Sequence, residues 1–237
     1  MKRKLSLVLL LLAAWLGGAQ PAYAATDSQD RNITIVKKTR VAYNRGNKVN
    51  TWTTYGAGKK KAGKVKSGYK FTATGQAKYK GRTWYRIKNN KWILGTNTVT
   101  TKKYASIKAA AAKKTKQNKV VKLANAQVGK AYVWGATGPY SFDCSGLTMY
   151  VYKKTTGLSL PHYSVSQRYY GKAVSTKRLV KGDLLFFGSK SAPHHVGIYV
   201  GGGKFVHASS PTVGVIKSKV SKNRSSAFYP SSARRVI

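Results

Sequence analysis

Short runs of β-branched and aromatic residues, separated by Gly and Asn, fill the chain between residues 33 and 100. β-branched and aromatic residues are enriched in strands, and Gly and Asn are enriched in turns. The pattern therefore predicts a small all-β barrel domain over residues 33–100. The predicted strands cover 33–36, 41–43, 70–73, 83–87 and 92–94, with a hairpin turn at 88–91.

Helical spacing replaces this alternation in the C-terminal half of the chain. Apolar residues recur at helical positions over residues 120–128, and Gly129 ends the segment. A second apolar run, over 147–151, predicts a buried helix with Cys144 at or near its N-terminus. With the strands that follow, residues 120–237 are predicted to form an α+β domain.

The segment between these regions has a composition of its own. Residues 101–119 are rich in Lys and Ala and contain no acid. Ala and Lys favour helices, yet uniform positive charge opposes compact packing. We expect a linker that is helical in part and separates two domains.

A β-hairpin is predicted near the C-terminus. Residues 194–200 alternate like a strand, the glycines at 201–203 turn the chain, and residues 204–208 return. In an antiparallel hairpin with an odd number of loop residues, His195 and His207 lie on one face, either opposite or diagonal to each other.

The first residues have the features of a secretory signal peptide. A basic start precedes an apolar run at residues 5–16, and Ala22-Tyr23-Ala24 is a small-x-small cleavage signal. The run is too short to span a bilayer, and Cys144, the one cysteine, is not placed for a lipid anchor. We expect a signal peptide at 1–24, a polar tail at 25–32 and a secreted, cell-wall-associated protein without a transmembrane anchor.

Charge narrows the choice of partners. The chain has 45 Lys and Arg against four Asp and no Glu, which gives a formal net charge of +41. Such a charge bears on partners rather than on fold. Since an exported chain rarely meets nucleic acid, we expect no nucleic-acid partner and instead anionic wall polymers such as teichoic acids. A basic surface that serves solubility alone is the alternative.

The scarcity of acids disfavours two classes of chemistry. Glycoside hydrolysis would need Asp143 and Asp183 close together, and Asp183 lies in a predicted turn. A carboxylate metal site lacks ligands. We therefore expect no metal and no cofactor.

Cys144 is the candidate nucleophile. Unpaired N–H groups at a helix start stabilise a thiolate, and a lone cysteine cannot form an internal disulfide. With His195 and His207, it would supply a nucleophile, a base and an orienting group. A buried inert thiol and a zinc site formed by the same three residues are the alternatives. His162 and His194 are expected to be packing or surface residues.

Six blocks resemble the NlpC-type (NlpC/P60) family of peptidoglycan cysteine endopeptidases, in order and approximate spacing. They are Tyr132-Val133-Trp134-Gly135, Asp143-Cys144-Ser145-Gly146, Leu160-Pro161, Gly182-Asp183-Leu184-Leu185-Phe186-Phe187, His195-Val196-Gly197-Ile198-Tyr199 and Val206-His207-Ala208. The resemblance covers residues 120–237 and implies a papain-like core, with N-terminal helices packed on an antiparallel sheet. It also implies peptidoglycan as the partner.

The resemblance further implies a reaction. Cys144 would attack a stem-peptide carbonyl, usually that of γ-D-glutamyl joined to a diamino acid, and form an acyl-enzyme. His195 would act first as base and then as acid, and His207 would orient it. The Cys144 backbone N–H and the Tyr132 hydroxyl would form the oxyanion site.

The residues beside the nucleophile have two interpretations. In similar enzymes the positions of Asp143 and Ser145 contact substrate, but Asp143 fits a helix cap equally well. Family members often have Arg after the Leu-Pro pair, whereas His162 stands here, so substrate contacts on this rim stay open. The rival functions are an amidase or acyl transferase on the same fold and a non-catalytic cationic wall-binding protein.

The N-terminal region has a looser resemblance. Residues 79–87 followed by Trp92-Ile93 resemble wall-attached modules of the bacterial SH3-like and surface-layer types. This resemblance implies a cell-wall-binding domain over residues 33–100. Its aromatic residues are expected mainly in the core.

Overall fold

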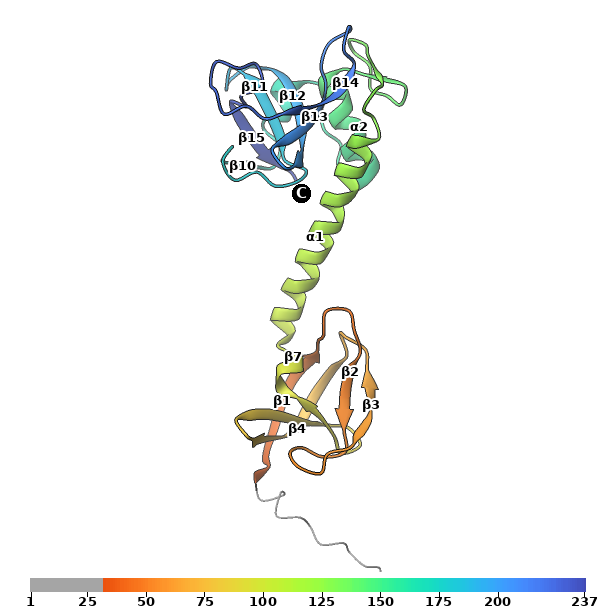
Figure 1. The fold of residues 1–237 in the computed structure, drawn as a ribbon, viewed down its shortest axis with the longest axis vertical. Coiled ribbons are helices and arrows are strands. Elements are labelled where there is room, and N and C mark those ends of the chain that lie inside the picture. Colours follow the sequence, from red (N-terminus) through yellow and green to blue (C-terminus); the bar gives the residue numbers. More distant parts are fainter. Residues whose placement is uncertain (1–31) are drawn as a thin grey trace, which may run out of the picture. The chain divides into compact units, whose positions relative to one another are not determined.

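The computed structural model describes residues 32–237. The predicted signal peptide, residues 1–24, lies outside the described residues. The chain divides into two compact units between Thr101 and Lys102, and Figure 1 shows the strands of the first unit and the mixed elements of the second.

Seven strands form one antiparallel sheet in the first unit, in the order β3-β2-β6-β5-β4-β1-β7. They are β1 (Thr34–Ala42), β2 (Val49–Trp52), β3 (Lys61–Val65), β4 (Lys70–Tyr79), β5 (Arg82–Ile87), β6 (Lys91–Leu94) and β7 (Thr98–Val99), with the short 3-10 helix η2 (Gly95–Asn97) before β7. The two strands predicted at 33–36 and 41–43 form the single strand β1, which has a register shift between Ile35 and Lys38. The hairpin turn predicted at 88–91 is confirmed, with Asn89 and Asn90 at positive φ.

Aromatic side chains fill the core of this unit. Tyr55, Trp84, Tyr85 and Trp92 are all buried, which confirms the expectation that such residues belong mainly to the core. The all-β character of the first unit is confirmed. Its closure into a barrel stays a prediction.

The charged segment forms one unbroken helix, α1 (Thr101–Asn125), so the expectation that residues 101–119 are helical only in part is wrong. Their role as a linker stays a prediction. No Gly or Pro interrupts this segment, and Ala, Lys and Gln are strong helix formers. Its lysines are exposed, so water and salt screen their mutual repulsion. The buried residues of α1, Val120 and Ala124, lie near its C-terminal end. Within residues 32–237, no helix combines the length and apolarity that crossing a membrane requires.

The second unit has an antiparallel six-stranded sheet in the order β10-β15-β11-β12-β13-β14. Its strands are β10 (Lys172–Val174), β11 (Leu184–Gly188), β12 (Pro193–Gly201), β13 (Lys204–Ala208), β14 (Val215–Lys219) and β15 (Ser232–Arg235). Two short parallel strands, β8 (Ala131–Tyr132) and β9 (Ser141–Phe142), precede the helices α2 (Cys144–Thr156) and α3 (Ser164–Gln167). The predicted α+β character is confirmed.

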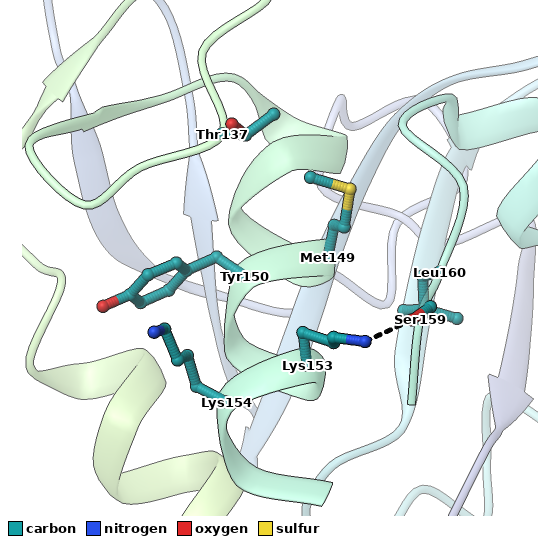
Figure 2. Close-up of a pocket in the computed structure, with 7 residues that line it drawn as sticks. All are labelled: Thr137, Met149, Tyr150, Lys153, Lys154, Ser159 and Leu160. Atoms are coloured by element: carbon teal, nitrogen blue, oxygen red, sulfur yellow. Dashed lines mark hydrogen bonds between the residues drawn. The ribbon is translucent and has the colours of Figure 1, made fainter. Parts of the chain in front are cut away.

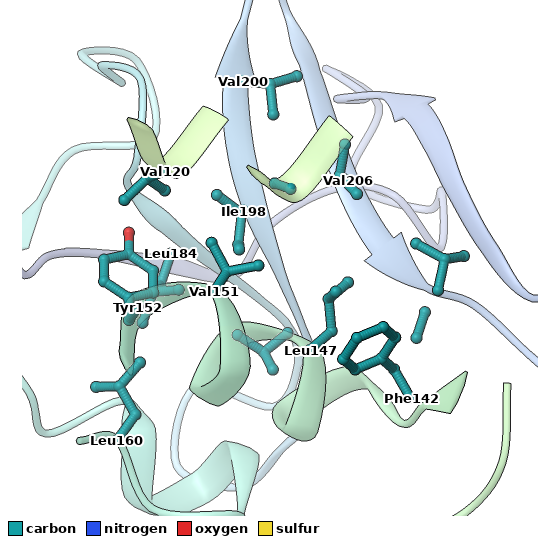
Figure 3. Packing of buried hydrophobic residues seen from close by; sticks show 14 of the residues in the cluster. Val120, Phe142, Leu147, Val151, Tyr152, Leu160, Leu184, Ile198, Val200 and Val206 are labelled. Carbon is teal, nitrogen blue, oxygen red and sulfur yellow. The ribbon is translucent and has the colours of Figure 1, made fainter. Parts of the chain in front are cut away.

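Alternate residues of the sheet enter two different hydrophobic clusters. Val196, Ile198 and Val206 pack with Leu147 and Val151 of α2, and Figure 3 shows this cluster. Leu185, Phe187 and Phe205 belong to a second cluster, because successive strand residues point to opposite faces. The second cluster lies on the same face as the two candidate histidines.

Candidate active site

The start of α2 holds Cys144, as the apolar pattern predicted. Asp143 is the N-cap residue, and its Oδ1 accepts hydrogen bonds from the Gly146 N–H at 2.6 Å and from the Ser145 hydroxyl at 3.0 Å. The cap interpretation of Asp143 is therefore confirmed. A Cβ at position 146 would collide with the carbonyl oxygen of Ala136, so the close loop explains the glycine there.

The pKa of the Cys144 thiol reflects burial, a nearby carboxylate and neighbouring backbone N–H groups. Burial raises the pKa of the Cys144 thiol, as does the negative charge of Asp143, while hydrogen bonds from the N–H groups of Val196, Ser145 and Cys144 itself lower it. The net direction of this pKa is upward, so the resting group is a neutral thiol near pH 7. The Val196 N–H belongs to the peptide bond that links His195 to Val196. The thiol thus lies against the strand that carries the first candidate histidine.

His195 and His207 form a hydrogen-bonded pair. The Nε2 atom of His195 lies 2.8 Å from Nδ1 of His207, and Nε2 of His207 lies 2.9 Å from the Ser218 hydroxyl. The register of β12 with β13 places Ile198 opposite Val206, so the two histidines are diagonal on one face. This arrangement confirms the geometry that the hairpin pattern predicted. A Cβ at Gly197 would lie 3.1 Å from Cβ of His207, so the glycine leaves room for the second ring.

Both imidazoles are held in their neutral form. Burial lowers the pKa of His195 to about 3, with further contributions from His207 and His194. Burial alone lowers the pKa of His207 to about 4. Aromatic rings cause much of this burial, since Phe205 stacks 4.5 Å from the His207 ring and Phe187 lies 5.7 Å from His195. A neutral thiol and a neutral imidazole pair are therefore the resting forms of these groups at neutral pH.

Tyr132 lies within electrostatic range of the nucleophile. Burial raises the pKa of its hydroxyl, and the charges of Cys144 and Asp143 raise it further. Tyr132 thus remains a hydrogen-bond donor near the sulfur throughout the physiological pH range.

His162 has a different environment from the one expected. Its Nε2 atom lies 2.6 Å from Oδ2 of Asp143, the same oxygen that accepts the Gly135 N–H at 3.0 Å. The expectation that His162 is a packing or surface residue is therefore incomplete: the ring is partly exposed, yet it contacts the carboxylate next to the nucleophile. Sequence reasoning missed this contact because residues 143 and 162 are joined only by the fold. It also missed Ser218, a lone hydroxyl in a lysine-rich strand.

Asp183 belongs to a separate site. It is fully buried, and both of its oxygens lie 2.9 Å from Arg235 nitrogens. Among residues 32–237, no three His, Cys, Asp or Glu side chains are grouped as a metal ion requires. The zinc alternative with Cys144, His195 and His207 therefore finds no ligand cluster there.

A cavity of about 310 Å³ lies along α2, away from its N-terminal end. Figure 2 shows Met149, Tyr150, Lys153 and Lys154 of α2 around it, together with Leu160 and its neighbours. Neither Cys144 nor the histidine pair lines this cavity. It is therefore distinct from the candidate site.

A thiol at a helix start, together with two hydrogen-bonded imidazoles on the adjacent strands β12 and β13, is the side-chain set of a cysteine-type hydrolase. Comparison with known families agrees with this class. Residues 129–234 match the model of the NlpC/P60 family, so this part of the chain is an NlpC/P60 domain.

Individual relatives match the same region. "Protein P54" of Enterococcus faecium is 42% identical over 92 residues, which are 39% of this chain and 18% of that protein. "Probable endopeptidase p60" of Listeria innocua is 48% identical over 88 residues, which are 36% of this chain and 19% of the relative. The chain thus spans less than a fifth of the length of either relative. The solved NlpC/p60 domain of peptidoglycan hydrolase SagA is 37% identical and covers 50% of this chain and 97% of its own, with a TM-score of 0.46.

Proposed function

We propose that this chain is a secreted peptidoglycan hydrolase, a cysteine endopeptidase that cleaves stem peptides through Cys144, His195 and His207. The observation that carries the proposal is the hydrogen bond between His195 and His207, together with the contact of the Cys144 thiol with the N–H of Val196, the residue that follows His195 on β12. The names of the relatives, endopeptidase and peptidoglycan hydrolase, support the reaction class and the substrate.

The hydrogen bonds define which nitrogen acts as the base. His195 uses Nε2 to contact His207, and His207 uses its own Nε2 to contact Ser218. If each Nε2–H donates along this chain, the lone pair of His195 Nδ1 is left to accept the thiol proton. His207 then orients His195 and stabilises the imidazolium that forms.

The reaction proceeds in two steps. As His195 removes the Cys144 proton, the sulfur attacks the peptide carbonyl carbon, and the resulting oxyanion accepts hydrogen bonds from the Cys144 N–H and the Tyr132 hydroxyl. The imidazolium protonates the leaving amine, and a thioester remains. A water molecule, deprotonated by His195, then hydrolyses the thioester and restores the thiol.

The bond cleaved is proposed to be the one between γ-D-glutamyl and the diamino acid. Asp143 and Ser145 would contact the substrate beside this bond, and residues 33–100 would bind the wall. An excess of positive charge would favour retention on teichoic acids. An amidase or acyl transferase is the rival activity.

Digestion of one defined peptidoglycan by the chain from Ala25 onward tests this function. Mass spectrometry should find stem peptides split between two amino acids, whereas an amidase would release whole stems. Cys144→Ala should lower the rate by at least about a thousandfold, because it removes the nucleophile. A Cys144→Ala protein that lyses walls as fast as the native chain would show that charge, and not catalysis, is the cause.

A further inference from the structure

A second cavity, of about 400 Å³, lies in the second unit and is lined by several positively charged side chains. Arg168 follows α3, Lys190 belongs to the loop between β11 and β12, and Arg234 lies in β15. Four residues add hydroxyl groups to the lining, Ser175, Thr176, Ser231 and Ser232, and three add apolar surface, Ala173, Val174 and Ala233. Cations from three separate elements therefore surround one concavity, unlike the lysines on the exposed surface of α1.

No side-chain carboxylate within residues 32–237 is left to balance these cations. The acidic residues there are Asp143 and Asp183. Asp143 pairs with His162, and Asp183 pairs with Arg235. Neither aspartate is therefore free to pair with the cations of the cavity.

The Arg168 guanidinium is fixed in place and keeps an unused donor. It donates to the backbone carbonyl of Lys190 and to the Tyr169 hydroxyl at 3.0 Å, and it lies 4.4 Å from the centre of the Tyr169 ring. Its Nε atom is buried and has no hydrogen-bond partner within residues 32–237. The anchored guanidinium therefore holds a permanent positive charge at the cavity wall, which favours an anionic ligand.

We propose that this cavity binds phosphate groups of a phosphodiester polymer. Guanidinium groups suit phosphate oxygens, an ammonium adds charge, and hydroxyls can donate to the remaining oxygens. A volume of about 400 Å³ accommodates a phosphate with an attached alcohol unit. The site is separate from Cys144 and the histidine pair, and the inference does not depend on the proposed cleavage reaction.

The site would also contact the segment that leads to the candidate base. The loop with Lys190 continues directly into β12, which carries His195, and the Ser164 hydroxyl donates to the Pro193 carbonyl at 2.7 Å. A polymer bound here would hold the second unit on the wall through the same loop.

Calorimetric titration of the full chain can test the proposal, with three probes at physiological salt: inorganic phosphate, a glycerol phosphate oligomer and polyglutamate of equal charge. The oligomer should bind, and K190Q/R234Q should weaken this binding at least about tenfold, because two charged contacts are lost. The matched control K204Q/K219Q removes the same charge from exposed positions of β13 and β14, and should bind as the native chain does. Inorganic phosphate should compete with the oligomer.

Two results would overturn the proposal. One is equal weakening in both double variants, and the other is equal affinity for polyglutamate and the glycerol phosphate oligomer; either would show diffuse charge attraction. The cleavage reaction is tested apart from this site. Cys144→Ala should keep oligomer binding, and K190Q/R234Q should still cleave a soluble muropeptide.

Discussion

The two buried aspartates of the second unit, Asp143 and Asp183, have different hydrogen-bond partners and different structural roles. Asp183 pairs with Arg235 through both oxygens and accepts the Val180 N–H at 2.8 Å. Asp143 caps α2 next to the candidate nucleophile and pairs with His162. Each carboxylate is satisfied, but the partners have different chemistry.

The two pairs differ in the aspartate's partner, which is an arginine in one pair and a histidine in the other. Arg235 stays charged at every physiological pH, and its bond to Asp183 raises its pKa further. The pair ties β15 to the beginning of β11. His162 is partly exposed, so solvent reaches its hydrogen bond to Asp143. The Asp183 pair therefore stabilises the sheet, whereas the Asp143 pair is open to an approaching ligand.

Asp183→Asn should have the largest effect on stability. The substitution leaves the Arg235 charge partly buried without its partner, which should cost about 3 kcal/mol of unfolding free energy. Urea denaturation at pH 7 measures this loss. The reaction rate per folded molecule should stay near that of the native chain, and a large loss of rate would contradict the structural role.

Substitutions of Asp143 should separate the cap from the charge. Asp143→Ala removes the acceptor for the Gly146 N–H and should cost about 1 to 2 kcal/mol. Asp143→Asn keeps a capping oxygen and should cost only a few tenths of a kcal/mol. If substrate contacts the carboxylate, both variants should raise KM. Equal stability losses in the two variants would rule out the cap as the main role.

The His195–His207 pair should make the stability of the fold sensitive to acid. Because burial lowers the pKa of His195 and His207, unfolded molecules bind protons between pH 6.5 and 5 that folded molecules do not. The unfolding free energy should therefore decrease as the pH is lowered from 6.5 to 5, by on the order of 1 kcal/mol per pH unit for each histidine. Urea midpoints at several pH values measure the slope.

A matched pair of variants sharpens this test. His207→Phe replaces one of the two imidazoles among aromatic rings and should reduce the slope by about half. Asp183→Asn should leave the slope unchanged, because Arg235 does not titrate in this range. A slope that His207→Phe does not alter would contradict the assignment to this pair.

His162→Gln should have the smallest effect. Glutamine can still donate to Asp143, so the stability change should remain within about 0.5 kcal/mol. Steady-state kinetics should show a KM increase of no more than about threefold, with kcat unchanged, if His162 acts only at the substrate rim. His194→Gln, at the exposed neighbouring histidine, is the control for KM and should leave it unchanged.

Local pattern predicted the elements that rely on few neighbours. The start of α2 at Cys144, the turn at Asn89-Asn90 and the shared face of His195 and His207 follow from helix spacing, turn chemistry and strand alternation. The missed strands β2 and β3 contain Asn, Gly and Lys, whose pattern gives little signal. β2 pairs with β6 and with β3, and these hydrogen bonds stabilise strands that intrinsic β-propensity alone would not predict.

Side-chain partners far apart in the chain required the tertiary structure. The sequence alone predicted catalytic roles for Cys144, His195 and His207. Because acidic residues are scarce in the chain, it also drew attention to each aspartate. It could not show that His162 meets Asp143, that Ser218 extends the histidine pair, or that Arg168, Lys190 and Arg234 share a cavity. Such contacts depend on how strands and loops pack, because chain separation carries no information about distance once the sheet has formed.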